Sequence, residues 1–210
     1  MSATITNIPL GPLQTNGYIL AADGHAVMID PGGDAHLVLA ELRRQDVVLD
    51  AIWLTHAHFD HVGGIADILK THPVPVKMHE DGAVLLRTAG DSARGYGLPF
   101  TDPPTEFTPI AAGERLTVGS TEVFTLFTPG HAPGHLAFHV PSSDVVFSGD
   151  ALFQRSIGRT DLPLADHETL ITSIVDKLLP LPGHTVVLSG HGPPTTIAEE
   201  REFNPYLPRQ

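Results

Sequence analysis

Short apolar runs alternate with helical stretches along this chain. The runs have the length of β-strands and end at turns rich in glycine and proline. In the first half they predict strands over residues 5–9, 17–21, 25–30, 51–55 and 74–78. Helices are expected from Asp34, as N-cap, to about Arg44, near 65–71 and around 81–88. The segment 90–113 carries four prolines and little periodicity, so we expect a long surface loop at the rim of a site.

The second half repeats this organisation. Strands are expected over residues 116–118, 122–128, 136–140, 145–148 and 185–189. Apolar residues between Leu170 and Leu179 recur at helical spacing, so a helix is predicted from Asp166 to the prolines that follow, and a short acidic helix near 197–202. Two strand-rich halves that each carry helices predict an α+β fold, an αββα sandwich of two mixed β-sheets flanked by helices. Since no linker or repeat divides the chain, a single domain over 1–210 is expected.

Composition excludes several classes of protein. The 210 residues include no cysteine, which rules out disulfides, thiolate nucleophiles and cysteine-held iron–sulfur clusters. The net charge of −12 argues against nucleic acid or an anionic membrane as partner, because both require a cationic surface. No signal peptide or membrane-spanning run is visible, so we expect a cytoplasmic protein with a small-molecule substrate. Oligomeric state is left open by the sequence.

Histidine is the unusual entry, with 13 residues against 12 Lys and Arg together. The buried strand at 51–55 runs directly into three imidazoles and a carboxylate, in the segment THAHFDHVGG at 55–64. Burying these groups without partners would cost several kcal/mol, whereas a divalent cation takes them as ligands. His56 and His58 point the same way in an extended segment and can reach one metal. Asp60 and His61 follow as the chain turns into a helix, and can face a second metal.

Three further strand ends each supply a ligand of the same type. His131 stands in TPGHAPGH, Asp150 in FSGD and His191 in LSGHG. Glycines beside these residues permit close approach of the backbone. The sequence therefore predicts a metal site with nitrogen and oxygen ligands at one edge of the sandwich. His135 and His139 are expected to support the loop of His131.

The pattern HxHxDH, followed by PGHxPGH, SGD and GHG, resembles the metallo-β-lactamase fold superfamily over nearly the whole chain. Within it, GRTD at 158–161 resembles the short, single-domain bacterial glyoxalase II-like hydrolases. The resemblance implies two divalent metals, zinc first and iron or manganese as options, that share a hydroxide for attack on a small thioester such as S-lactoylglutathione. It places His56, His58 and His131 on the first metal, Asp60, His61 and His191 on the second, and Asp150 between them. Asp60 is also a candidate for handling a proton.

The chain departs from full-length glyoxalase II, which resembles it in the metal domain but carries an additional helical region with basic residues for glutathione. We therefore expect no separate C-terminal glutathione-binding domain. Arg155, Arg159 and Phe153 are the candidate substrate contacts. For Arg159 we favour an ion pair with Asp161 that fixes the loop, and Phe153 is expected to form a wall of the pocket.

Three alternatives remain beside thioester hydrolysis. A mononuclear Fe(II) persulfide dioxygenase would use His56, His131 and Asp150, which have the ligand types of a facial triad. A lactonase would use the same metal core, but none of the tyrosines lies near a ligand in the sequence. A metal-binding protein without turnover is the third alternative, and the complete ligand set argues against it.

Overall fold

Alternating apolar side chains along the strands build two sheets that share one interior layer. In β3, Met28 faces the outer helices, whereas Val27 and Ile29 face the second sheet. Trp53 and Phe138 meet across that shared layer, with ring centroids 5.5 Å apart. The structure, a computed structural model, describes residues 3–208.

The first sheet is mixed and six-stranded, in the spatial order β1-β2-β3-β4-β5-β6. Its strands are β1 (Thr4–Leu10), β2 (Thr15–Ala22), β3 (His25–Ile29), β4 (Val48–Trp53), β5 (Val76–Met78) and β6 (Thr108–Pro109). The first three strands run antiparallel, and β3 to β6 run parallel. The carboxyl ends of the parallel strands therefore lie at one edge.

The second sheet is also mixed, in the order β14-β13-β10-β9-β8-β7, and a two-stranded hairpin stands beside it. Its strands are β7 (Arg115–Val118), β8 (Thr121–Phe127), β9 (Leu136–Val140), β10 (Val145–Gly149), β13 (Val186–Ser189) and β14 (Thr195–Thr196). The separate hairpin is formed by β11 (Leu152–Phe153) and β12 (Ser156–Ile157). Strands β10 and β13 pair in parallel, while the other pairs of this sheet are antiparallel.

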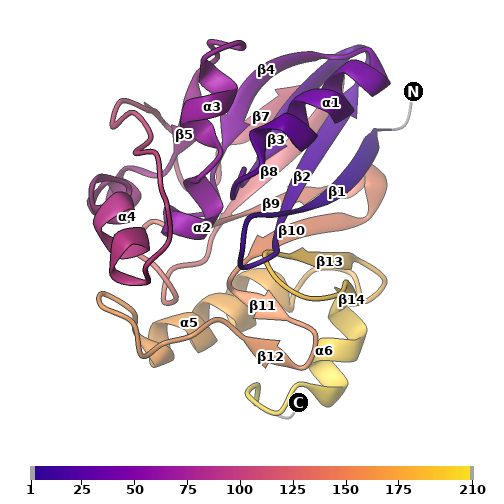
Figure 1. The fold of residues 1–210 in the computed structure, drawn as a ribbon. Helices are drawn as coiled ribbons and strands as arrows, with labels where there is room; N and C mark the ends of the chain where they lie inside the picture. Colours follow the sequence, from indigo (N-terminus) through magenta and orange to yellow (C-terminus); the bar gives the residue numbers. More distant parts are fainter. Residues whose placement is uncertain (1–2, 209–210) are drawn as a thin grey trace.

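Helices cover the two outer faces (Figure 1). Over the first sheet lie α1 (Ala35–Gln45), α2 (Phe59–Val62), α3 (Ile65–Leu69) and α4 (Ala83–Gly95). Over the second lie α5 (His167–Ser173), which continues as a π-helical turn over Ile174–Leu178, and α6 (Ile197–Phe203). Separate apolar clusters fill the two sheet–helix layers and the layer between the sheets. The predicted αββα sandwich is confirmed.

One local prediction is wrong, and a second holds for the position of a residue but not for its hydrogen bond. Helix α4 runs to Gly95, so the first part of the expected loop at 90–113 is helical. Its buried face consists mainly of small residues, Ala89, Gly90 and Ala93, which give little apolar periodicity in the sequence. Asp34 holds the N-cap position of α1 without capping it, because its carboxylate accepts a hydrogen bond from the Gly11 amide instead.

Asp166, in contrast, caps α5 as expected, accepting a hydrogen bond from the Thr169 amide at 2.8 Å. Within residues 3–208, no helix combines the length and the apolar character that crossing a bilayer requires.

Candidate metal centre

The predicted ligands follow strand ends at a single edge of the sandwich. His56 and His58 lie between β4 and α2, and His131 lies in the loop from β8 to β9. Asp150 directly follows β10, and His191 follows β13. Because β10 and β13 are parallel neighbours, their ends deliver these last two residues to the same place.

Three imidazoles converge into a first group. Nε2 of His56 lies 3.0 Å from Nδ1 of His58, and Nε2 of His131 lies 2.9 Å from that same atom. The ring of His131 is oriented by its Nδ1, which is 2.9 Å from the carbonyl oxygen of Arg159. The three nitrogens lie close enough together to hold a single metal ion.

Asp60, His61 and His191 form a second group of three possible ligands. Oδ2 of Asp60 lies 3.1 Å from Nε2 of His191 and 3.6 Å from Nε2 of His61. The hydroxyl of Thr15 donates to the same Asp60 oxygen at 3.0 Å, which fixes the carboxylate.

Asp150 lies between the two groups. Its Oδ2 is 3.6 Å from Nε2 of His131 in the first group and 3.6 Å from Nε2 of His191 in the second. Its Oδ1 is 3.4 Å from Nε2 of His61. A carboxylate in this position can contact a cation in either group.

Two buried atoms of the centre test whether metals fit it. Within residues 3–208, Nε2 of His61 and Oδ1 of Asp150 are buried without a hydrogen-bond partner. Such atoms are costly in an apolar interior, and a cation bound between them would satisfy both. Gly190 keeps this space open, because a Cβ there would collide with Oδ1 of Asp150. The donor set, imidazole and carboxylate alone, suits zinc, iron or manganese.

Behind the centre, Asp30 holds His61 and the neighbouring Thr55 in place. Its Oδ1 accepts from the Thr55 amide at 2.8 Å, and its Oδ2 accepts from the Thr55 hydroxyl at 2.6 Å. The same Oδ2 lies 3.0 Å from Nδ1 of His61. A carboxylate that accepts from one ring nitrogen directs the other nitrogen at a metal. Asp30, His56 and His61 also form a third group of possible ligands, but the oxygens of Asp30 are occupied by these hydrogen bonds.

His135 supports the loop of His131, as expected, and also supports Asp150. Its Nε2 accepts a hydrogen bond from the Asp150 amide at 3.1 Å, while its Nδ1 lies 2.8 Å from the hydroxyl of Thr128. His139 lies on β9 opposite Val146, and no side-chain hydrogen bond links it to that loop in the described part of the chain. The expectation for His139 is therefore wrong.

The histidines of the centre differ in the direction in which burial and neighbouring charges shift their pKa. Burial, with neighbouring histidines adding to it, lowers the pKa of His58 to about 4 and that of His56 well below its usual value. These rings are neutral and have lone pairs to offer. For His61, burial lowers the pKa, but the carboxylates of Asp150 and Asp60 outweigh it and raise the pKa well above its usual value.

A pocket of about 450 Å³ opens onto both groups. Apolar side chains form most of its walls, and its lining residues include Leu13, Phe59, Leu98, Phe153 and Leu162. Phe153 therefore lies where the sequence predicted a pocket wall.

Arg159 and Tyr96 supply the polar side chains of this pocket apart from the candidate ligands and Ser92. Arg159 also makes the expected bidentate pair with Asp161, at 2.9 and 3.0 Å. The Tyr96 ring packs on Phe59, with centroids 5.5 Å apart.

Arg155 does not line this pocket. Its guanidinium carbon lies 4.9 Å from the ring centroid of Phe203 on α6, and its amide donates to Glu200 at 2.8 Å. The residue belongs to the turn of the β11–β12 hairpin, which faces α6, so the expectation of a substrate contact there is wrong.

The fully buried carboxylate of Glu200 ties that hairpin to α6. Besides the Arg155 amide, it accepts from the Thr195 hydroxyl at 2.6 Å and from the Asn204 side-chain amide at 2.8 Å. Asn204 in turn donates to the carbonyl of Ser156 at 3.1 Å. Because Asp150 precedes this hairpin and Arg159 follows it, Glu200 anchors the segment that presents both.

Asp30, Tyr96 and Glu200 were missed by sequence reasoning. Asp30 follows strand β3 and precedes Pro-Gly-Gly, so the rule that found the other strand-end ligands would have found it. Tyr96 stands at the end of α4, inside the segment interpreted as loop, and Glu200 has no sequence feature that marks it as buried.

Comparison with known proteins finds one superfamily and relatives named as hydrolases. A family model described as the metallo-beta-lactamase superfamily matches residues 10–191. The chain is 43% identical to the probable metallo-hydrolase YqgX of Bacillus subtilis, over 95% of each chain. It is 38% identical to the hydroxyacylglutathione hydrolase GloC of Haemophilus influenzae, over 95% of this chain and 96% of the relative.

Two solved structures are similar to this chain over almost its whole length. BLEG-1, described as a B3 metallo-beta-lactamase, shares 43% identity with a TM-score of 0.90, over 97% of this chain and 99% of its own. TTHA1623 in a di-iron-bound form shares 42% identity with a TM-score of 0.91, over 96% of this chain and 100% of its own.

Proposed function

This chain belongs to the metallo-β-lactamase superfamily, and we propose that it is a dinuclear metallohydrolase of small thioesters, S-lactoylglutathione or a related compound. The observation that carries the proposal is the position of Asp150, 3.6 Å from a ligand nitrogen of each group. A carboxylate placed there can serve two cations at once. The GloC relative, named as a hydroxyacylglutathione hydrolase, supports the choice of thioester.

In the proposed assignment, His56, His58 and His131 hold one cation, Asp60, His61 and His191 hold the other, and Asp150 contacts both. Two bound cations would supply an activated water and polarise the substrate carbonyl. We assign Asp60 to metal binding first, since its Oδ2 already faces His191 and the Thr15 hydroxyl. A further role in proton transfer is the less favoured part of the assignment.

The pocket suits a thioester because the leaving group of a thioester needs little acid catalysis, and the pocket offers few proton donors. Attack of water on the carbonyl carbon forms a C–O bond, and collapse of the tetrahedral adduct breaks the C–S bond. The sulfur leaves as a thiolate, the acyl group leaves as a carboxylate, and both protons of the water are released to solvent. A thiol with a pKa of about 8.5 needs little help from an acid. Among the lining residues that are not candidate ligands, Tyr96 and Ser92 each carry a hydroxyl, and Arg159 can donate hydrogen bonds but not a proton.

Metal analysis combined with a substrate panel tests the proposal. Protein reconstituted with zinc, iron or manganese is assayed for bound metal and for turnover of S-lactoylglutathione, other acyl thioesters and a β-lactam. The expected result is about two metals per chain and highest turnover on thioesters. Asp150→Asn should lower both quantities, whereas Asp144→Asn, on the exposed turn before β10, should change neither. Less than one metal per chain together with no thioester turnover would refute the proposal.

Lactone hydrolysis is the second candidate, favoured by Tyr96, whose phenol lies in the metal pocket and can donate to an opening ester. Adding lactones to the panel, with wild type and Tyr96→Phe, separates the two activities. A persulfide dioxygenase would need only His56, His131 and Asp150, and the complete second group argues for hydrolysis instead. Oxygen uptake by the iron-loaded protein with glutathione persulfide would reverse that preference.

A further inference from the structure

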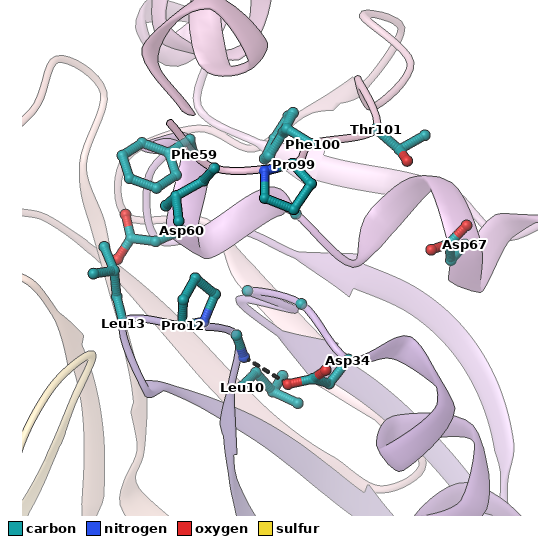
Figure 2. Close-up of a pocket in the computed structure, with 15 residues that line it drawn as sticks. Leu10, Pro12, Leu13, Asp34, Phe59, Asp60, Asp67, Pro99, Phe100 and Thr101 are labelled. Atoms are coloured by element: carbon teal, nitrogen blue, oxygen red, sulfur yellow. Dashed lines mark hydrogen bonds between the residues drawn. The ribbon is translucent and has the colours of Figure 1, made fainter. Parts of the chain in front are cut away.

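A second cavity, of about 390 Å³, adjoins the metal pocket. It lies between the β1–β2 turn and the segment after α4. Figure 2 shows Pro12 and Leu13 on one side of it and Phe59, Pro99 and Phe100 on the other. Asp60 lies at the end nearest Leu13 (Figure 2).

The floor of this cavity is formed by glycines, because three backbone segments meet there. Gly11 lies on the first segment, Gly32 and Gly33 on the second, and Gly63 on the third. A Cβ on Gly32 would collide with the carbonyl of Asp60, and one on Gly63 would come within 2.7 Å of the Gly32 carbonyl. The β1–β2 turn, which forms one wall of the cavity, is also fixed in place, because the carboxylate of Asp34 accepts a hydrogen bond from the Gly11 amide at 2.9 Å. The cavity is therefore preformed.

The cavity and the metal pocket share walls. Leu13, Phe59, Asp60 and Leu98 line both. Since Asp60 belongs to the second ligand group, a substrate whose reacting carbonyl lies at the metals can extend past this residue into the cavity. Each volume is in the range of small-molecule pockets, so the two together can hold both arms of a substrate.

The two pockets differ in charge. The cavity is lined by Asp34, Asp60 and Asp67 and by no lysine or arginine, although Lys70 pairs with Asp67 at 2.6 Å. Its remaining walls are glycyl, prolyl, leucyl and phenylalanyl, with Thr101. The metal pocket contains Arg159, whose carbonyl contacts His131 of the first group. Arg159 lines the metal pocket and not the cavity, and its guanidinium also pairs with Asp161 at 2.9 and 3.0 Å. An anionic arm is therefore favoured in the metal pocket, on the side of Arg159, and an uncharged arm in the cavity.

We propose that the cavity receives the acyl arm of the thioester and selects uncharged, apolar acyl groups, while the anionic thiol carrier lies on the side of Arg159. This inference rests on the proposed thioester hydrolysis. It defines the substrate class as thioesters with an apolar acyl group larger than lactoyl, in preference to acyl groups that end in a carboxylate.

The test compares S-pentanoylglutathione with S-glutarylglutathione, two acyl groups of equal length that differ in a terminal carboxylate. The zinc-loaded wild type should prefer the pentanoyl compound by about tenfold in kcat/KM. Asp67→Lys, at the far end of the cavity, should reduce this preference about fivefold by attracting the carboxylate. Thr101→Arg, at the exposed lip, should act in the same direction and replaces Asp67→Lys if that variant does not fold.

Asp50→Lys is the matched control, because Asp50 is about as exposed as Asp67 but lies on β4 beside His25. It should leave the preference unchanged. Inhibition by S-pentylglutathione and S-(4-carboxybutyl)glutathione, which cannot be hydrolysed, should follow the same order. Equal kcat/KM for both acyl groups, unmoved by Asp67→Lys, overturns the inference while thioester hydrolysis stands. If no thioester is turned over, the proposed function fails, and the affinities of the two thioethers, measured by calorimetry, decide the cavity's preference alone.

Discussion

Oδ2 of Asp30 lies 3.0 Å from Nδ1 of His61, on the side of the imidazole that faces away from the candidate metals. Both side chains are buried, and Asp30 also accepts hydrogen bonds from the Thr55 amide and hydroxyl. The pair therefore sets the tautomer of His61 and the direction of its Nε2.

Asp30→Asn should weaken metal binding at the second group by about 10- to 100-fold, because an amide NH₂ would face the Nδ1–H of His61. Competition with a chromophoric chelator measures the affinity, and circular dichroism checks the fold. Asp50→Asn is the matched control. Asp50 makes the same kind of contact with His25, at 2.9 Å, on the exposed surface. Equal affinities in the two variants would contradict the role given to Asp30.

Metal uptake at pH 7 should release about one proton or more per chain. Asp150 and Asp60 raise the pKa of His61 well above its usual value in the metal-free protein, so this ring carries a proton that a metal must displace. The pKa of His191 is also raised, mainly by its hydrogen bond with Asp60, against the lowering effect of burial. Calorimetric titration with zinc in buffers of different ionisation enthalpy counts the protons. Heats that do not depend on the buffer would exclude this protonated state.

The metal-free protein should lose stability as the pH falls from 7 to 5. Burial lowers the folded-state pKa of His135 well below 6.5, so the unfolded chain binds the extra proton first. The resulting stability is complete above about pH 6.5 and is lost below it, at up to about 1.4 kcal/mol per pH unit for one such group.

Urea unfolding at a series of pH values, in wild type and in His135→Gln, measures this contribution. The variant should show a shallower pH dependence, since glutamine does not titrate. Parallel curves would show that His135 contributes nothing to the pH dependence.

Removing the carboxylate of Glu200 should destabilise the fold by about 3 kcal/mol, because Glu200→Ala leaves buried donors of Arg155, Thr195 and Asn204 without their acceptor. Glu199 is the control. It is an exposed neighbour whose Oε2 lies 2.9 Å from the same Thr195 hydroxyl, which has one proton and makes its shorter contact with Glu200. Glu199→Ala should cost about 0.5 kcal/mol. Chemical denaturation of the metal-free proteins gives both values, and similar losses would mean that the buried network is not needed.

The layered fold could be predicted because its strands obey local rules. In β3 and β4 the residues alternate between two faces, both buried, and each strand ends at a turn that the sequence marks. The grouping of the candidate ligands could be predicted because most of them follow such a strand end, and Asp60 and His61 begin the helix after one. Long-range contacts between side chains could not be predicted from the sequence. Nothing local in the sequence places Tyr96 beside Phe59, or Arg155 over Phe203, since both depend on how a helix packs against a distant loop.

The candidate ligands are drawn from both sheets, from His56 after β4 to His191 after β13. Bound cations would therefore tie together segments separated by more than half of the chain. In the unfolded protein the same cross-link would close a very long loop. The entropic cost of closing a loop grows only slowly with its length. In a chain without cysteine, metal ions are then the available means of cross-linking the two halves. Metal binding should therefore add its own free energy to the stability of the metal-free fold.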